Sequence, residues 1–164
     1  MKSRLLPLLA LFTALSAVGA AIKIPAIVGS VAFDVFPALI AAALLGGGAG
    51  AIVGLLGHLL SALLAGFPLG PMHAFIAIEM AVLVWMFGRF FQNGKKTTGS
   101  ILFILANSFI APIPFIFLLN SAFYLGIVPS LIIGSFINTV IALVAIPRLS
   151  ILVHQNRNNR EVKL

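Results

Sequence analysis

The amino-acid sequence is dominated by long apolar stretches that follow one another with only short breaks. Inside a lipid bilayer the backbone N–H and C=O groups find no water, so a spanning chain must form helices or a closed barrel. A barrel would show short segments of alternating polarity, whereas these stretches are continuous and rich in Ala, Leu, Ile and Gly. They therefore predict an all-α integral membrane protein.

The composition excludes most soluble folds. Hydrophobic residues make up 62% of the 164 residues and charged residues only 8%, against about a half and a quarter in ordinary soluble domains. A soluble domain of this size could not bury that much apolar surface, and the length leaves no room for a separate catalytic domain. Because the chain has no cysteine, disulfides and thiolate metal sites are excluded.

Proline, glycine and charged residues divide the chain into six predicted spans. We expect these spans at residues 5–22, 31–45, 49–65, 72–91, 100–119 and 127–152, with loops at 66–71, 92–99 and 120–126. The second span is shorter than the roughly 20 residues that usually cross, which leaves open whether it is tilted, kinked at Pro37 or partly re-entrant. Pro112 and Pro114 interrupt the fifth span. Residues 1–153 thus form a six-transmembrane-helix bundle, and 154–164 form a polar cytoplasmic tail.

The start of the chain has two readings. Lys2 and Arg4, followed by an apolar run and small residues, resemble a secretory signal. Because further spans follow at once, we favour an uncleaved first span with a cytoplasmic N-terminus.

The basic residues behind the net charge of +7 gather in clusters beside the spans: Lys2 and Arg4; Arg89, Lys95 and Lys96; Arg148, Arg157, Arg160 and Lys163. Such clusters usually lie on the cytoplasmic side of a membrane. Four predicted spans separate the first two clusters and two separate the last two, so all three can share that side. We therefore expect both termini in the cytoplasm and a multi-pass protein of the cell (plasma) membrane. No basic face is long enough to bind a nucleic-acid duplex.

Polar side chains in the outer half of the predicted bundle are the candidates for contact with a solute. Glu79 lies about two turns inside the fourth span, where an ionisable group is costly and usually faces protein or water. Its alternatives are solute binding, proton transfer and pairing with Lys23. His73 lies about 240° from Glu79 on an ideal helix, so we place Phe75 rather than His73 on the face of Glu79. The candidate substrate-binding residues are Asp34, His73, Phe75, Glu79, Asn120, Tyr124 and Asn138.

Other polar and small residues have a structural interpretation. His58 and Asn107 lie within apolar spans, where a hydrogen bond to a neighbouring helix is the expected role, and Asn138 shares that alternative. Asp34 has loop capping as its alternative to ligand contact. Small residues at four-residue spacing let helix backbones approach closely, and on the first span they are candidates for docking a partner: Ala10, Ala14, Ala17 and Ala21.

Motifs for chemistry are missing. Residues 88–96 look only faintly like a phosphate loop, because the second Gly falls one residue late and no strand precedes it. There is no nucleophile elbow and no cluster of carboxylates or histidines for a metal. We therefore expect no catalytic residue, no metal, no cofactor and no enzymatic activity.

The segment 34–46 (DVFPALIAAALLG) and the following GAGAIVG at 48–54 resemble the S component, the substrate-binding membrane subunit, of energy-coupling factor (ECF) transporters. The Ala-rich first span and the long first outer loop add to this resemblance, which covers most of the chain. It implies capture of a small vitamin or vitamin precursor at the outer side of the lipid bilayer. It also implies a coupling transmembrane subunit that meets the alanine face of the first span, and two cytoplasmic ATPases that drive release. On general similarity, the first candidate solute is a cobalamin precursor such as α-ribazole.

Two other functions compete with solute capture. A self-sufficient proton-coupled carrier would use Glu79 and transport solute without partners. A small intramembrane enzyme would use His58 or His73 with a nearby serine, but the sequence supplies no convincing nucleophile–base pair.

Overall fold

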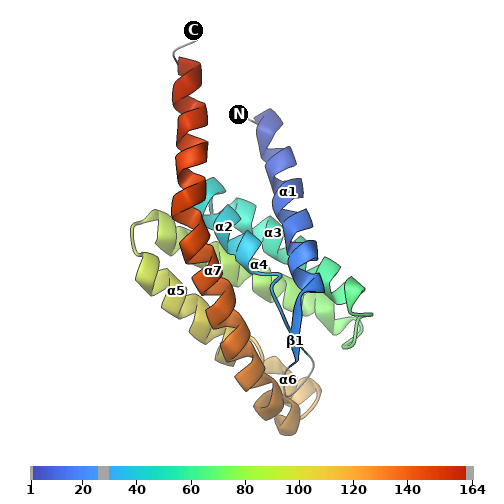
Figure 1. The fold of residues 1–164 in the computed structure, drawn as a ribbon. Helices are drawn as coiled ribbons and strands as arrows, with labels where there is room; N and C mark the ends of the chain where they lie inside the picture. Colours follow the sequence, from blue (N-terminus) through green and yellow to red (C-terminus); the bar gives the residue numbers. More distant parts are fainter. Residues whose placement is uncertain (1, 26–29, 162–164) are drawn as a thin grey trace.

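The computed structural model describes residues 2–25 and 30–161, which form a helical bundle. The first residues of α1 and the last residues of α7 lie at the same end of this bundle (Figure 1). The elements in chain order are α1 Lys2–Ala21, β1 Lys23–Pro25, β2 Ser30–Ala32, α2 Phe36–Leu45, α3 Gly47–Leu64, α4 Met72–Gln92, α5 Lys96–Leu105, the π-helix η1 Ala106–Ile110, α6 Pro114–Leu118 and α7 Ser121–Glu161.

The predicted number of hydrophobic helical segments is confirmed. Within the described ranges, four segments are long and apolar enough to cross a membrane: α3, α4, the α5–α6 segment and α7. Two shorter apolar helices, Leu5–Ala21 and α2, bring the number to six. Pro112 and Pro114 break the fifth span as predicted. Just before Pro112 the chain passes through the wide turn of η1, where the Ala111 N–H donates to the Ala106 carbonyl at 2.8 Å. Pro112 and Pro114 have no N–H to donate to a continuous helix.

Three predicted boundaries were wrong. Residues 31–35 are not helical: β2 pairs with β1 in an antiparallel hairpin, with Lys23 opposite Ala32, and α2 begins only at Phe36. The loop predicted at 92–99 is shorter, because α5 already begins at Lys96. The turn predicted at 120–126 is instead the start of α7, since Asn120 Oδ1 accepts the Phe123 N–H at 2.8 Å and so caps the helix.

The helix α7 also continues beyond the predicted sixth span. It runs to Glu161 and contains Pro129 and Pro147, so most of the polar tail is helical. The remaining tail residues 162–164, with Lys163 of the third basic cluster, lie outside the described residues.

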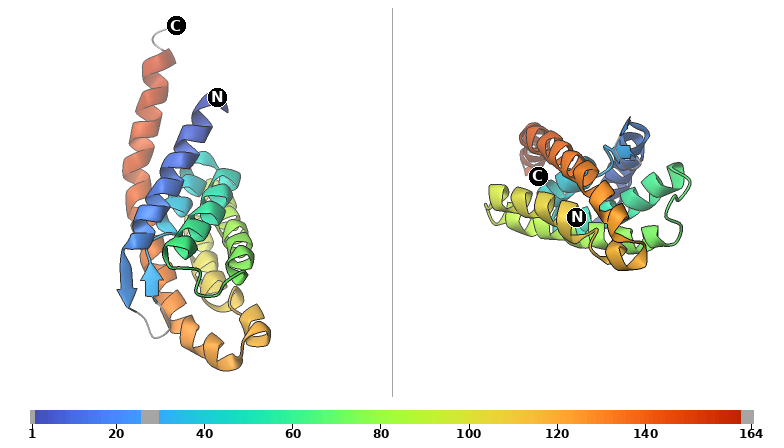
Figure 2. Two further views of the ribbon diagram at one scale, coloured as in Figure 1. Left: turned by 90° about the vertical axis from the view of Figure 1, so that its right-hand side faces the viewer. Right: turned by 90° about the horizontal axis from the view of Figure 1, so that it is seen from below.

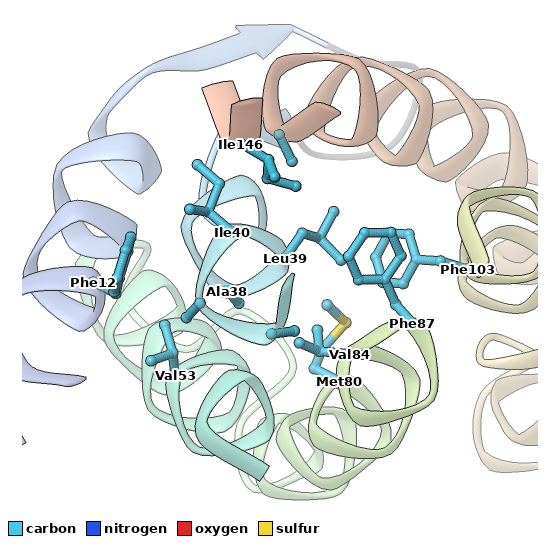
Figure 3. Packing of buried hydrophobic residues seen from close by; sticks show 13 residues of the cluster. Phe12, Ala38, Leu39, Ile40, Val53, Met80, Val84, Phe87, Phe103 and Ile146 are labelled. Atoms are coloured by element: carbon cyan, nitrogen blue, oxygen red, sulfur yellow. The ribbon is translucent and has the colours of Figure 1, made fainter. Parts of the chain in front are cut away.

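The short helix α2 is the centre of the bundle. Ten residues of α-helix are about 15 Å long, half of a hydrocarbon core of about 30 Å. Its residues Pro37–Ala42 are all buried, and Figure 3 shows Leu39 and Ile40 surrounded by side chains such as Phe12, Val53 and Phe103. Protein therefore covers α2 on all sides, and Pro37 starts this helix rather than kinking it.

Glycines let α2, α3 and α4 pack closely around this centre. A Cβ added at Gly50 of α3 would lie 2.6 Å from Ala42 Cα of α2, and one at Gly88 of α4 would lie 2.7 Å from Gly47 Cα. Both distances are too short for any side chain. At these two contacts the absence of a side chain lets neighbouring helix backbones approach closely.

Candidate functional site

A cavity of about 360 Å³ lies between α3, α4, the α5–α6 segment and α7, with residues 32–35 on one side. Its wall comes from the last turns of α3 and the first halves of α4 and α7, so it lies away from the chain ends (Figures 1 and 2). The volume falls within the usual range of small-molecule sites. The walls are mostly apolar, and the polar side chains among them are Asp34, His58, Ser61, His73, Glu79, Asn107, Ser130, Ser135 and Asn138.

The structure brings together some of the predicted site residues and separates the others. Four of them line the cavity: Asp34, His73, Glu79 and Asn138. Three do not belong to its wall: Phe75, Asn120 and Tyr124.

The face of α4 that meets the cavity differs from the predicted one. Phe75 is 43% exposed and packs edge-on against Phe115, with ring centroids 6.4 Å apart. His73 and Glu79 are about 240° apart in one direction around the helix and therefore about 120° apart in the other. Ile76, which also lines the cavity, lies between them on that shorter arc. The cavity covers this wide arc, so His73 and Glu79 share it and Phe75 does not.

Asn120 and Tyr124 stabilise the corner between α6 and α7 instead. Asn120 caps α7, and the Tyr124 hydroxyl donates to the Phe109 carbonyl at 3.2 Å. Both residues thus fix the position of the helices that carry the cavity wall.

Asn138 on α7 holds the segment before α2 in place. Its Nδ2 donates to the carbonyls of Ala32 at 3.0 Å and Gly134 at 2.9 Å. Its Oδ1 accepts the N–H groups of Val35 at 3.2 Å and Phe36 at 2.9 Å. N–H groups at a helix start have no partner within the helix, and here Asn138 supplies one from another helix. All four hydrogen-bonding positions of the amide are used, so Asn138 shapes the wall and has no position left for a solute.

Two histidines form a pair beside the loop between α3 and α4. His58 Nε2 and His73 Nδ1 are 3.2 Å apart, and His73 Nε2 accepts the Leu69 N–H at 3.3 Å. Because a backbone N–H can only donate, His73 Nε2 carries no proton, and the proton of His73 is on Nδ1. That N–H then donates to His58 Nε2. Both imidazoles are therefore neutral in this arrangement.

Glu79 has an oxygen without a partner. Its Oε2 is buried and makes no hydrogen bond within the described part of the chain, and the same holds for Ser130 Oγ on α7. Burying a polar oxygen without a hydrogen bond costs free energy, most of all for a carboxylate. Because Glu79 lines the cavity, its carboxylate could accept a hydrogen bond from a molecule there.

His58 and Asn107 were not among the predicted solute contacts, although both line the cavity. Both make the interhelical hydrogen bonds that their positions predict, Asn107 through Nδ2 to Ser135 Oγ at 2.8 Å. The sequence feature that could have identified both residues as candidates for the cavity is a polar side chain in the middle of an apolar span. Phe103, Phe115 and Phe123 also line the cavity. The sequence does not distinguish these three from the other phenylalanines, because the chain has 14 phenylalanines in all.

The small residues predicted for partner docking lie on the outer side of α1. Ala10, Ala14 and Ala21 are exposed and Ala17 is half-buried. The opposite side of α1 is buried through residues such as Phe12. The alanine face is thus left uncovered by the rest of the described chain.

Comparison with known proteins identifies relatives of this fold. The family model for "ECF transporter, substrate-specific component" matches residues 4–158. A solved structure described as "Structure and mechanism of the S component of a bacterial ECF transporter" superimposes with a TM-score of 0.75 at 21% sequence identity, and the match covers 93% of this chain and 99% of that chain. No curated protein sequence matches significantly.

Proposed function

This chain belongs to the family of ECF transporter substrate-specific components, and on that basis we propose that it captures a small vitamin or vitamin precursor in the cavity described above. It is a multi-pass integral membrane protein of a transporter family, which is not a family of enzymes. The observation that carries the proposal is the cavity itself, because its apolar walls hold a few polar groups and Glu79 has an oxygen without a partner. Such walls are typical of sites that bind small molecules.

The distribution of charge supports an outward-facing cavity. Arg89, Lys95 and Lys96 lie where α4 ends and α5 begins, and Arg148 lies in the second half of α7. The cavity uses the other ends of α4 and α7. Under the positive-inside rule the basic end, which also carries the start of α1 and the end of α7, faces the cytoplasm. Solute then enters from the outer side.

The exposed alanine face of α1 supports docking of a coupling subunit. We assign this contact to Ala10, Ala14, Ala17 and Ala21, whose small side chains allow a second helix to approach closely. The coupling transmembrane subunit would connect the chain to two cytoplasmic ATPases, which supply the energy for release.

Among vitamin precursors, α-ribazole is the first solute to test. It is an uncharged nucleoside with a flat ring system and several hydroxyl groups. The phenylalanine-rich walls suit the ring, and Glu79 and Ser130 can accept hydrogen bonds from the hydroxyls.

Reconstitution into liposomes tests the proposal. The detergent-solubilised chain should bind α-ribazole alone, whereas uptake should require the coupling subunit, both ATPases and ATP. Uptake by the chain alone, driven by a proton gradient and abolished in Glu79→Gln, would instead identify a proton-coupled carrier.

A further inference from the structure

The charges around the cavity define which solutes it accepts. We infer that the captured solute carries no negatively charged group and presents a hydrogen-bond donor to Glu79, with a protonated nitrogen giving the tightest binding. This inference rests on the proposed function, because it names the chemical class of the solute in the same cavity.

Positive charge is missing from the part of the cavity wall that the structure describes. No lysine or arginine is among the described residues that line it. The His58–His73 pair does not supply a charge in this arrangement either, because His73 Nε2 accepts the Leu69 N–H and His58 Nε2 accepts the proton of His73. A carboxylate or phosphate entering this cavity would lose its water without gaining a cation, which is strongly unfavourable.

The start of α2 does not offer an anion site in place of a cation. A helix start can bind an anion through its free N–H groups, and the start of α2 lies beside the cavity. The N–H groups of Val35 and Phe36 at this helix start already donate to Asn138 Oδ1.

Hydrogen-bond acceptors remain available in the cavity. Glu79 lines the cavity and has no hydrogen-bond partner within the described part of the chain, and an ionised carboxylate can only accept hydrogen bonds. Asp34, the second carboxylate of the wall, has an interaction of its own, so the inference rests on Glu79. A ligand N–H or N⁺–H placed against Glu79 forms the charge-assisted hydrogen bond that the protein lacks.

The walls also favour a ring beside the donor. Phe103, Phe115 and Phe123 line the cavity, and the rings of Phe115 and Phe123 lie 6.0 Å apart, tilted by 45°. Aromatic faces stack on flat rings and attract cations. The geometry therefore suits a flat ring compound with a basic nitrogen.

Three indoles of nearly equal size and different charge test the inference: tryptamine (a cation), tryptophol (neutral) and indole-3-acetate (an anion). Calorimetric titration into the detergent-purified full-length chain should show binding in that order, with tryptamine roughly tenfold or more tighter than tryptophol. Indole-3-acetate should not bind measurably. Glu79→Gln should remove the advantage of tryptamine, so that tryptamine and tryptophol bind with similar affinity.

Two further variants guard against a folding artefact. Glu79→Asp retains the charge and should keep tryptamine ahead of tryptophol. Ile78→Ala changes a residue of α4 that is 58% exposed, and it should behave as the wild type does.

Four results would overturn the inference: indole-3-acetate binding as tightly as tryptamine, a preference for tryptamine that survives Glu79→Gln, no binding of any of the three indoles up to millimolar concentration, or co-purification of an anionic metabolite. The last result would leave solute capture intact and refute only the charge class. Failure of ATP-dependent uptake with every solute would refute the capture function instead.

Discussion

Asn138→Ala should lower the free energy of unfolding by more than the loss of a single hydrogen bond would. The substitution removes four hydrogen bonds of 2.9–3.2 Å. It also leaves the N–H groups of Val35 and Phe36 without a partner at the start of the buried helix α2. With roughly 0.6–1 kcal/mol for each bond, the loss in the free energy of unfolding is about 2–4 kcal/mol.

Thermal unfolding of the detergent-solubilised protein measures this loss. Trp85 is the single tryptophan of the chain, so its fluorescence reports unfolding without a label. The matched control is Asn120→Ala, which removes one exposed hydrogen bond at the start of α7 and should cost about 1 kcal/mol or less. Equal shifts in the unfolding midpoint for the two variants would refute the role of Asn138 as an anchor for residues 32–36.

Further substitutions test the packing, the loop and the partner surface. Gly50→Ala should cost roughly 1–3 kcal/mol through overpacking against Ala42, whereas Gly48→Ala, with open space around it, should unfold at the wild-type temperature. His73→Ala should release the Leu69 N–H and raise its hydrogen-exchange rate by about tenfold; an unchanged rate would contradict a hydrogen bond from Leu69 to His73. Ala14→Leu should abolish co-purification of the coupling subunit while solute binding in titration remains; retained co-purification would refute docking there.

The helical segments could be predicted because each depends on local composition. Apolar runs bounded by Pro, Gly and charge gave six segments, and Pro112 and Pro114 break the fifth one where expected. The hairpin β1–β2 could not be predicted, because its three-residue strands are fixed by contacts far away in the chain. Asn138, for example, lies 106 residues from Ala32.

The residues of the cavity wall were only partly predictable, because some of them are brought there by contacts between helices that are far apart in the sequence. Ionisable groups in apolar spans are costly, so Glu79 and His73 stood out, and both line the cavity. Which arc of α4 faces inward depends on how the neighbouring helices pack, so helix spacing alone could not show that Phe75 lies outside the cavity wall. The pairing of His58 with His73 likewise follows from the α3–α4 contact and not from local sequence.

Retention of a solute by the purified protein tests the central claim most directly. Ala111 lines the cavity, whereas its neighbour Ile110 is 62% exposed, so phenylalanine at the two positions gives a matched pair of variants. Native mass spectrometry should show one small molecule bound to the wild type and to Ile110→Phe, and none bound to Ala111→Phe. A wild type without any bound molecule, or an Ala111→Phe variant that keeps it, would contradict capture in this cavity.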